Sequence, residues 1–507
     1  MTTTPPPFYH TLSDAQIDAL TALGCIFMPG ASVKVSPGVT FDPLRFRNVT
    51  FGGSVLMAGM PAAVHNALLH DVTIHADVTI RRSDIVNYEI MPGATVERTG
   101  SMEFRPGTSF TVNTLSEAGG YSVTARPGLT IAEAELEAYG HQPAAPFTPE
   151  HGTVGRNSRV CGAARLQSVI IADRAVVGAN VIAEDSVIDS DAELTDGAMV
   201  YRSYVGRGCR VTKGFTAHDS LFFDNTQMEC GEAAAVFAGP HAVSCHKSTL
   251  LIACRCSFFN AGSGTNMSNH AYRLGPVHHG MFRRGCKTGS NAYVLWPATF
   301  GAFSLISGDH KHHPDTTDLP FSYLIEKDGV LTIMPGMMLR SAGLLRDLDK
   351  WPARDRRKDC EPIDCRVLTP DVAEAMVRGI RLLEGVTANT KWEGYHLSAA
   401  LAMRGRRLYD TALLAWLAPE VIAMARKGAA NEFANAAEAW LGKAVTDIAD
   451  DELASLAERS REARAELIRM ARADAAKDLL PSTEASLGTA ETNPFIAELS
   501  RRLEQLQ

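Results

Sequence analysis

The sequence contains no long hydrophobic run, no excess of basic residues and no export signal. No stretch of about 18 or more uncharged apolar residues occurs, so we expect no membrane-spanning helix. Lysine and arginine number 49 against 57 aspartate and glutamate residues, and the net charge of −8 excludes the basic surface of a general nucleic-acid-binding protein. The first residues, Met1–Pro7, have neither a basic flank nor an apolar core, so no signal peptide is expected.

Paired cysteines are absent as well. None of the ten cysteines belongs to a Cys-x-x-Cys pair, which excludes a zinc-ribbon or thioredoxin-like motif. Some of them, such as Cys161 and Cys209, occupy positions where an apolar residue would serve. Because the sequence shows no export signal, we predict reduced thiols and a cytoplasmic protein. A hydrophobic content of 45% excludes intrinsic disorder.

Signatures of nucleotide binding and of serine hydrolases are also missing. The segment 262–266 is rich in glycine, but it lacks the spacing of a dinucleotide loop and no helix pattern follows it. No Gly-x-Ser-x-Gly elbow occurs. No nucleotidyltransferase domain precedes the repeat described below, so we do not expect sugar-nucleotide synthesis.

Tryptophan and histidine are distributed unevenly. All five tryptophans lie at Trp296 or later, whereas eight of the 16 histidines lie between His241 and His313.

The N-terminal segment Leu12–Gly24 has the pattern of a short helix. Ser13 is a capping residue with a glutamine three positions on, and a glycine supplies the stop.

A short unit, Pro-Gly-x-Ser/Thr, recurs between β-branched runs. Proline fixes φ and glycine allows a positive φ, so each unit predicts a tight turn, and the recurrence predicts a repeated corner. The five units are 29–32, 37–40, 92–95, 106–109 and 127–130.

From Val154 onward a regular period replaces these scattered turns. Apolar residues recur roughly every six residues, which fits neither an α-helix nor an isolated strand but does fit a triangular solenoid. They occupy positions 154, 160, 166, 171, 177, 182, 188, 194, 200, 205 and 211. Four units are clear, for example Val177-Gly178 with Val181 and Val205-Gly206 with Cys209. A β-sandwich is the alternative, but its strands would recur about every 8–12 residues.

With its Pro-Gly turns, this repeat resembles the left-handed β-helix of hexapeptide-repeat proteins. Those proteins include sugar acyltransferases, the C-terminal domains of sugar nucleotidyltransferases and γ-class carbonic anhydrases. The wider chain resembles a less-characterised group of long hexapeptide-repeat proteins, which implies a fold and no secure activity. The shared segments are Cys245-His-Lys-Ser, Ser268-Asn-His-Ala-Tyr, Leu274-Gly-Pro-Val-His, Leu319-Pro-Phe-Ser-Tyr and Lys350-Trp-Pro-Ala-Arg-Asp.

We therefore predict a mainly β protein in three parts. Residues 1–28 form an N-terminal helical segment, residues 29–345 a left-handed parallel β-helix with irregular inserts, and residues 346–507 a C-terminal α-helical region. The helical pattern is clearest from Thr369-Pro370. There an N-cap residue and a first-turn proline precede an apolar stripe at positions 372, 376, 380 and 383. A last amphipathic segment is expected over residues 494–506, and we expect the helices to pack on the solenoid or to form an oligomer contact.

The segment 239–290 concentrates imidazole, amide and guanidinium groups that a solenoid face does not need. We predict His246, His270 and His278 as catalytic residues, with His246 first because Lys247 beside it offers an anion contact. A histidine can act as a general base near neutral pH, while amides stabilise an oxyanion and cations hold a phosphate or carboxylate. The predicted substrate-binding residues are Lys247, Asn260, Asn266, Asn269, Arg273, Arg283 and Lys287.

The resemblance to hexapeptide acyltransferases implies an acyl-CoA donor and a homotrimer. We therefore expect a transferase acting on a small sugar-like or anionic metabolite, with no nucleic-acid or membrane partner. In a metal-dependent alternative that resembles the γ-class carbonic anhydrases, His246, His270 and His278 bind a divalent ion such as zinc. The group at 310–313 is expected to be a solvated loop, with a lid or a weak metal site as the alternative. A non-catalytic scaffold or assembly subunit is the third possibility, because a long solenoid offers flat, rigid surfaces and the helical tail offers a further contact. In a structural interpretation of the segment 239–290, histidine and asparagine side chains simply stack along the solenoid.

Overall fold

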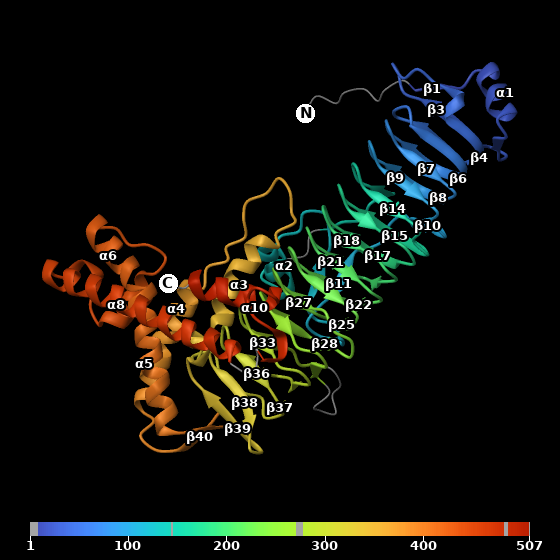
Figure 1. Ribbon diagram of the computed structural model, residues 1–507. Coiled ribbons are helices and arrows are strands. Elements are labelled where there is room, and N and C mark those ends of the chain that lie inside the picture. The colour runs from blue at the N-terminus through green and yellow to red at the C-terminus, as the bar shows by residue number, and fades with distance from the viewer. Residues whose placement is uncertain (1–8, 143–145, 270–276, 481–484, 506–507) are drawn as a thin grey trace. The chain divides into compact units, whose positions relative to one another are not determined.

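The computed structural model describes residues 9–142, 146–269, 277–480 and 485–505 (Figure 1). The chain divides into two compact units. The first unit comprises residues 1–280 with 356–361, and the second comprises residues 281–355 with 362–507. Each unit is described separately below.

The first unit is a parallel β-solenoid, in which short strands stack in register from one turn to the next (Figure 1). Its N-terminal turns contain β1 (His10–Thr11), β2 (Ile26–Phe27), β3 (Ser32–Val35), β4 (Phe46–Gly52), β5 (Ser54–Met57), β6 (Ala63–Ile74), β7 (Thr79–Arg81), β8 (Asp84–Ile90), β9 (Thr95–Glu97) and β10 (Ser101–Glu103). The later turns contain β13 (Gly152–Val154), β14 (Arg159–Cys161), β15 (Arg165–Ile171), β16 (Val176–Val177), β17 (Ile182–Ile188), β18 (Glu193–Leu194), β19 (Met199–Tyr201), β20 (Tyr204–Val205), β21 (Arg210–Thr212), β22 (Thr216–His218), β23 (Leu221–Phe222), β24 (Gln227–Glu229), β25 (Glu232–Ala234), β26 (Phe237–Ala238), β27 (Val243–Ser244), β28 (Leu250–Ile252), β29 (Cys254–Cys256), β30 (Asn260–Ala261) and β31 (Asn266–Ser268).

The interior of this coil consists of vertical ladders of apolar side chains. Because the strands pair in register, one residue per turn occupies the same interior position. One such ladder contains Val154, Ile171, Ile188, Val205, Phe222, Ala238 and Cys256, all of them buried. The predicted six-residue period is confirmed, with one error: Ala183 is buried, whereas its neighbour Ile182 is half-buried. Both are apolar, so only the alternation of strand β17 decides which of them points inward.

The corners of the coil depend on residues with positive φ. One corner series contains Asn157, Arg174, Asp191, Gly208, Asn225, His241 and Phe258, one residue per turn. The five Pro-Gly units are turns as predicted, each with a glycine φ between +73° and +81°. Two of them, 106–109 and 127–130, lie outside the regular coil. The predicted N-terminal helix is also confirmed as α1 (Asp14–Ala22), with Ser13 and Gln16 forming its capping box.

Residues 104–151 leave the coil at a single corner, and we call them the excursion. Strand β8 passes from Val86 to Tyr88 through the corner residue Asn87, which has a φ of 58°. In the next turn Glu103 lies opposite Val86 and Gly152 opposite Tyr88, so the whole excursion replaces one corner residue. It contains a hairpin, β11 (Thr111–Asn113) with β12 (Ser122–Thr124), and helix α2 (Ile131–Ala138).

The second unit begins with further parallel strands and ends in helices. Its strands are β32 (Gly280–Phe282), β33 (Lys287–Thr288), β34 (Tyr293–Leu295), β35 (Thr299–Phe300), β36 (Leu305–Ser307), β37 (Asp309–His310), β38 (Tyr323–Lys327), β39 (Val330–Met334), β40 (Thr390–Trp392) and β41 (Tyr395–Leu397). Its helices are α3 (Ala342–Ala353), α4 (Pro370–Glu384), α5 (Ala399–Trp416), α6 (Ala418–Lys427), α7 (Ala434–Leu441), α8 (Asp450–Ala475) and α10 (Pro494–Gln505). The predicted start at Pro370 and the final amphipathic segment are both confirmed. The fold is thus mainly β, a parallel solenoid with C-terminal helices.

One helical stretch, residues 399–427, is long and apolar enough by composition to cross a membrane. Half of its most apolar window is buried inside the protein. Pro419 divides the stretch into α5 and α6, and α5 also contains Arg404, Arg406 and Arg407. Burial of one face against neighbouring helices accounts for this composition without a membrane.

Candidate functional site

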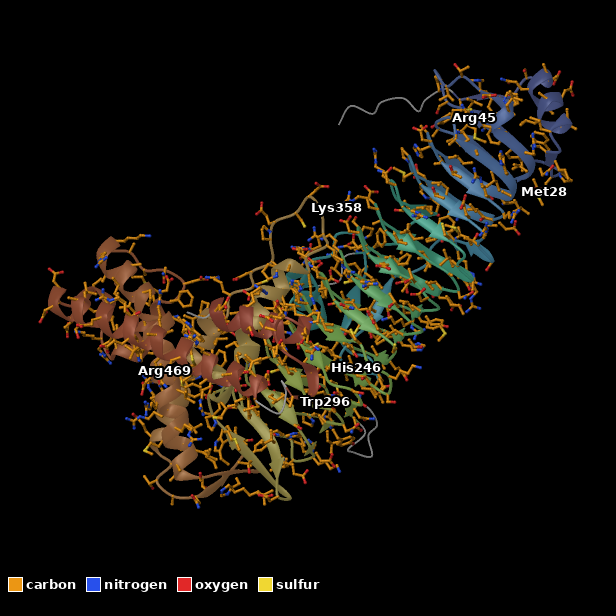
Figure 2. The ribbon with its side chains drawn as sticks, in the orientation of Figure 1. Met28, Arg45, His246, Trp296, Lys358 and Arg469 are labelled. Carbon is orange, nitrogen blue, oxygen red and sulfur yellow. The ribbon has the colours of Figure 1, made fainter. Side chains whose placement is uncertain are left out.

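Four of the residues predicted from the sequence lie at one corner of the coil. His246 and Lys247 are exposed in the turn between β27 and β28; Figure 2 labels His246. Asn260 and Asn266 lie one turn further along, opposite Val243 and Leu250 respectively. The structure therefore brings these four residues to adjacent turns, where the first three are exposed and Asn266 is half-buried.

The other predicted residues are distributed elsewhere. Asn269 is buried, and neither atom of its amide has a hydrogen-bond partner among the described residues. His278 is half-buried, whereas His270 and Arg273 lie outside the described residues. Arg283 and Lys287 belong to the second unit, where the guanidinium of Arg283 donates to Thr317 and the ammonium of Lys287 pairs with Asp347.

Two further histidines of the enriched region have structural roles. His241 is a corner residue with a φ of 55°, and its ring contacts that of Phe258 one turn later, tilted by 40°. His310 is fully buried and forms a 2.8 Å hydrogen bond between its Nδ1 and the hydroxyl of Tyr395. The expectation of a solvated loop over 310–313 is therefore wrong for His310, and burial lowers the pKa of this histidine to about 4.

A different histidine, His279, lies in a group that has the character of a site. Its ring centroid is 5.0 Å from that of Tyr121, in an edge-to-face contact, and 6.4 Å from that of Tyr139. The two tyrosine rings contact each other at 5.9 Å, also edge to face. The guanidinium of Arg255 lies 6.0 Å from the Tyr139 ring centroid and pairs with the carboxylate of Glu135. We call these five residues the tyrosine–histidine cluster.

The cluster exists because the excursion is fastened to the coil. The backbone NH of Leu115 donates to the carbonyl of Ala235 at 2.7 Å. Further along the excursion, the NH of Gly128 donates to the carboxylate of Asp189, also at 2.7 Å. Helix α2 packs where the coil has Gly239, since a Cβ there would lie 3.1 Å from the Ile131 side chain.

The excursion also has an internal ion pair that fixes α2 on its hairpin. The side chain of Glu137 is completely buried and accepts hydrogen bonds from Arg126 at 2.8 Å and from the Thr124 NH at 2.9 Å. A buried carboxylate is tolerated only when its charge and lone pairs are satisfied in this way. Thr130 and Glu133 form the capping box at the start of α2. These contacts define where Tyr121 and Tyr139 lie.

An open depression of about 650 Å³ lies on the excursion beside the cluster. Both tyrosines line it, together with Glu137 and small or polar residues, Gly120, Ser122, Ala138, Gly140 and Gln142. A volume of this size suits a small molecule, and aromatic walls with a few polar groups are typical of ligand sites.

The electrostatics of the cluster favour a neutral imidazole. The pKa of His279 is lowered, first by burial and then by the nearby charges of Arg255 and His278. Burial raises the pKa of the Tyr139 hydroxyl, and Arg255 partly opposes this effect. At neutral pH the cluster therefore offers an unprotonated His279 and a protonated Tyr139.

The sequence predicts His246, His270 and His278 as catalytic residues, whereas the group described here contains His279, the neighbour of His278. Tyr121, Tyr139, Arg255 and Glu135 were missed. A weak signal for α2 was present in Thr130 and Glu133, a capping-box pair that follows a Pro-Gly turn. No periodicity joins this helix to the coil turn that contains Arg255, more than a hundred residues later.

Within the described parts of the chain, no three histidine, cysteine, aspartate or glutamate side chains lie close enough to hold a metal ion. The metal-binding alternative stays a prediction, because His270 is one of its three proposed ligands. None of the ten cysteines, all of which are described, forms a disulfide.

Residues 149–387 match the model of a family described as a domain of unknown function (DUF4954). The match includes Arg255 and His279, but it begins after the two tyrosines. No curated protein matches the chain.

Proposed function

We propose that the protein is a transferase that moves an acyl group to a small sugar-like or anionic acceptor at the tyrosine–histidine cluster. The observation on which this proposal rests is that His279, a half-buried histidine with a lowered pKa, lies against two phenol rings and near a guanidinium. A neutral imidazole in such a position suits proton abstraction at physiological pH.

In the proposed step, an unprotonated ring nitrogen of His279 removes the proton from the acceptor hydroxyl or amine. The acceptor oxygen or nitrogen attacks the thioester carbonyl of an acyl-CoA, a tetrahedral oxyanion forms, and the carbon–sulfur bond then breaks. The imidazolium returns its proton to the departing thiolate, so His279 ends neutral. Arg255 attracts a phosphate or carboxylate of the bound substrates, and the faces of Tyr121 and Tyr139 pack against a sugar ring or acyl chain.

We also propose that the coil is left-handed and of the hexapeptide class, and that it assembles as a trimer. The six-residue period and the corner residues with positive φ support the class. The trimer is inferred from the resemblance to hexapeptide acyltransferases, and sedimentation equilibrium would test it.

The proposal is tested by measuring release of CoA from acetyl-CoA by chromatography, with amino sugars and hydroxy acids as acceptors. The variant His279→Gln should lose about 10²–10⁴-fold in rate, the usual contribution of a general base. The matched control is His218→Gln, whose ring stacks at 4.8 Å on Tyr201 in the coil, and it should keep the rate of the unaltered protein.

Two results would contradict the proposal. One is a folded His279→Gln variant that releases CoA as fast as the unaltered protein. The other is calorimetry that shows no binding of acetyl-CoA or of any acceptor, which would favour the scaffold alternative. A variant at the sequence-predicted base, His246→Gln, separates the two histidines, because only one of them can be the base in this scheme.

A further inference from the structure

Helix α3 in the second unit has a row of cations on one face. Arg346 and Lys350 lie one above the other along the helix, and Arg354, four residues after Lys350, is its C-cap. Lys287 of β33 joins them through its ion pair with Asp347, the residue next to Arg346. We call Lys287, Arg346, Lys350 and Arg354 the cationic row.

The charges of this group do not balance. Among the charged groups that act most strongly on Lys350, three are cations, Arg354, Arg346 and Lys287, and one is a carboxylate, Asp347. Asp347 is itself buried, and it is shared between Lys287 and Arg346, whose guanidinium lies 3.5 Å from its Oδ1. The other nearby carboxylate of α3, Asp349, interacts with Arg501 of α10.

Such an arrangement does not follow from the needs of folding. Like charges four residues apart destabilise a helix, and a half-buried lysine is ordinarily paired with a carboxylate. No hydrogen bond or ion pair connects the ammonium of Lys350 to a described residue, and burial together with the surrounding cations lowers its pKa. A local departure of this kind marks a functional surface.

We propose that the cationic row binds a phosphate group, either as inorganic phosphate or as the phosphate of a small monoester. A phosphate has up to two negative charges and several acceptor oxygens, and it can therefore accept from two guanidinium forks and an ammonium together. A single carboxylate offers only one charge for the same set of donors. The side chain of Lys287, which the sequence predicts as a substrate-binding residue, is less exposed than that of Arg346, at 18% against 49%.

The first experiment is calorimetric titration of the full-length protein with inorganic phosphate, glucose 6-phosphate and glucose. Phosphate or glucose 6-phosphate should bind, glucose should not, and Arg346→Gln/Lys350→Gln should weaken binding about tenfold or more. The matched control is Arg469→Gln/Lys477→Gln, which removes two exposed cations from α8 and the short turn after it, each already paired with a carboxylate. This control should bind as the unaltered protein does.

A second measurement does not depend on affinity. Limited reaction with acetic anhydride at pH 7.5, followed by mass spectrometry, compares the acetylation of Lys350 with that of Lys477. Phosphate should slow acetylation of Lys350 several-fold and leave Lys477 unchanged. The proposal is overturned if neither phosphate nor glucose 6-phosphate protects Lys350, or if the α3 double variant binds them as well as the α8 control. Binding of glucose 6-phosphate alone identifies the monoester as the ligand, and equal binding of both identifies the phosphate group itself.

Discussion

The regular coil and the excursion of the first unit are stabilised by two different kinds of contact. In the coil, an interior residue contacts its equivalents one turn before and one turn after, so each position is supported by repetition. In the excursion, each contact occurs once: Gly128 with Asp189, Leu115 with Ala235, Arg126 with Glu137. Repetition gives stability with no special chemistry, whereas unique contacts position unlike side chains beside one another. The tyrosine–histidine cluster belongs to the second kind.

The largest effect should come from the anchor that fastens the excursion. Asp189 is buried and accepts from the NH groups of Gly128 and Ser190 and from the hydroxyl of Tyr204, at 2.6–2.7 Å. The variant Asp189→Ala removes the acceptor of two backbone NH groups and leaves the Tyr204 hydroxyl only the Leu129 carbonyl, so we expect about 4 kcal/mol less free energy of unfolding. Urea denaturation measures this loss. The control is Asp196→Asn at an exposed corner, which should change stability by less than about 0.5 kcal/mol.

A loss of stability of similar size is expected when the pH is lowered. It should depend on the buried His310 and not on an exposed histidine. The pKa of His310 is lowered to about 4 in the folded protein, so the unfolded chain takes up this proton first as the pH falls. Stability is therefore retained above about pH 6.5 and decreases by about 3 kcal/mol as the pH falls towards 4.

Denaturation at pH 7 and pH 4.5 measures this change. The variant His310→Phe should reduce the difference between the two pH values, whereas His246→Gln should leave it unchanged. An equal pH dependence in His310→Phe and the unaltered protein would contradict the assignment.

A smaller loss is expected inside the excursion. The variant Glu137→Gln removes the negative charge that pairs with Arg126. It also replaces one of the two acceptor oxygens, which bind Arg126 and the NH of Thr124, by an amide nitrogen. We therefore expect the free energy of unfolding to fall by about 2–3 kcal/mol. Because this ion pair fixes α2, limited proteolysis should cut the excursion faster in the variant. The coil should resist cleavage equally in both proteins, and faster cleavage within the coil would argue that the two parts unfold together.

The smallest effect is expected from conservative substitutions in the interior of the coil. Ile171 and Ile188 lie in register in the same ladder and are both fully buried. Each Ile→Val substitution should cost about 1 kcal/mol, and the two values should agree closely because the environments repeat. A difference above about 1 kcal/mol between the two variants, measured by urea denaturation, would show that the turns are not equivalent.

The same contrast explains what could be predicted from the sequence. The coil is predictable because one rule, an inward apolar residue roughly every six positions, applies to every turn. It failed only at Ile182 and Ala183, where two apolar neighbours compete and the strand alternation decides. The excursion could not be predicted, because Asp189 and Gly128 are far apart in sequence and no pattern relates them. Composition singled out residues 239–290, the segment that contains His279, but it gave no reason to prefer His279 to its neighbour His278, because that choice depends on which ring meets Tyr121.

The central claim is that the coil supplies stability and the excursion supplies the site. Residues 104–151 replace one corner residue, so a variant in which a single asparagine takes their place restores an uninterrupted coil in the sequence. Calorimetric titration of this variant with acetyl-CoA, after circular dichroism has shown its β-structure and cooperative unfolding, is the most direct test. The account predicts a folded protein that no longer binds acetyl-CoA. A folded variant that binds acetyl-CoA as the full-length protein does, or one that does not fold, would contradict it.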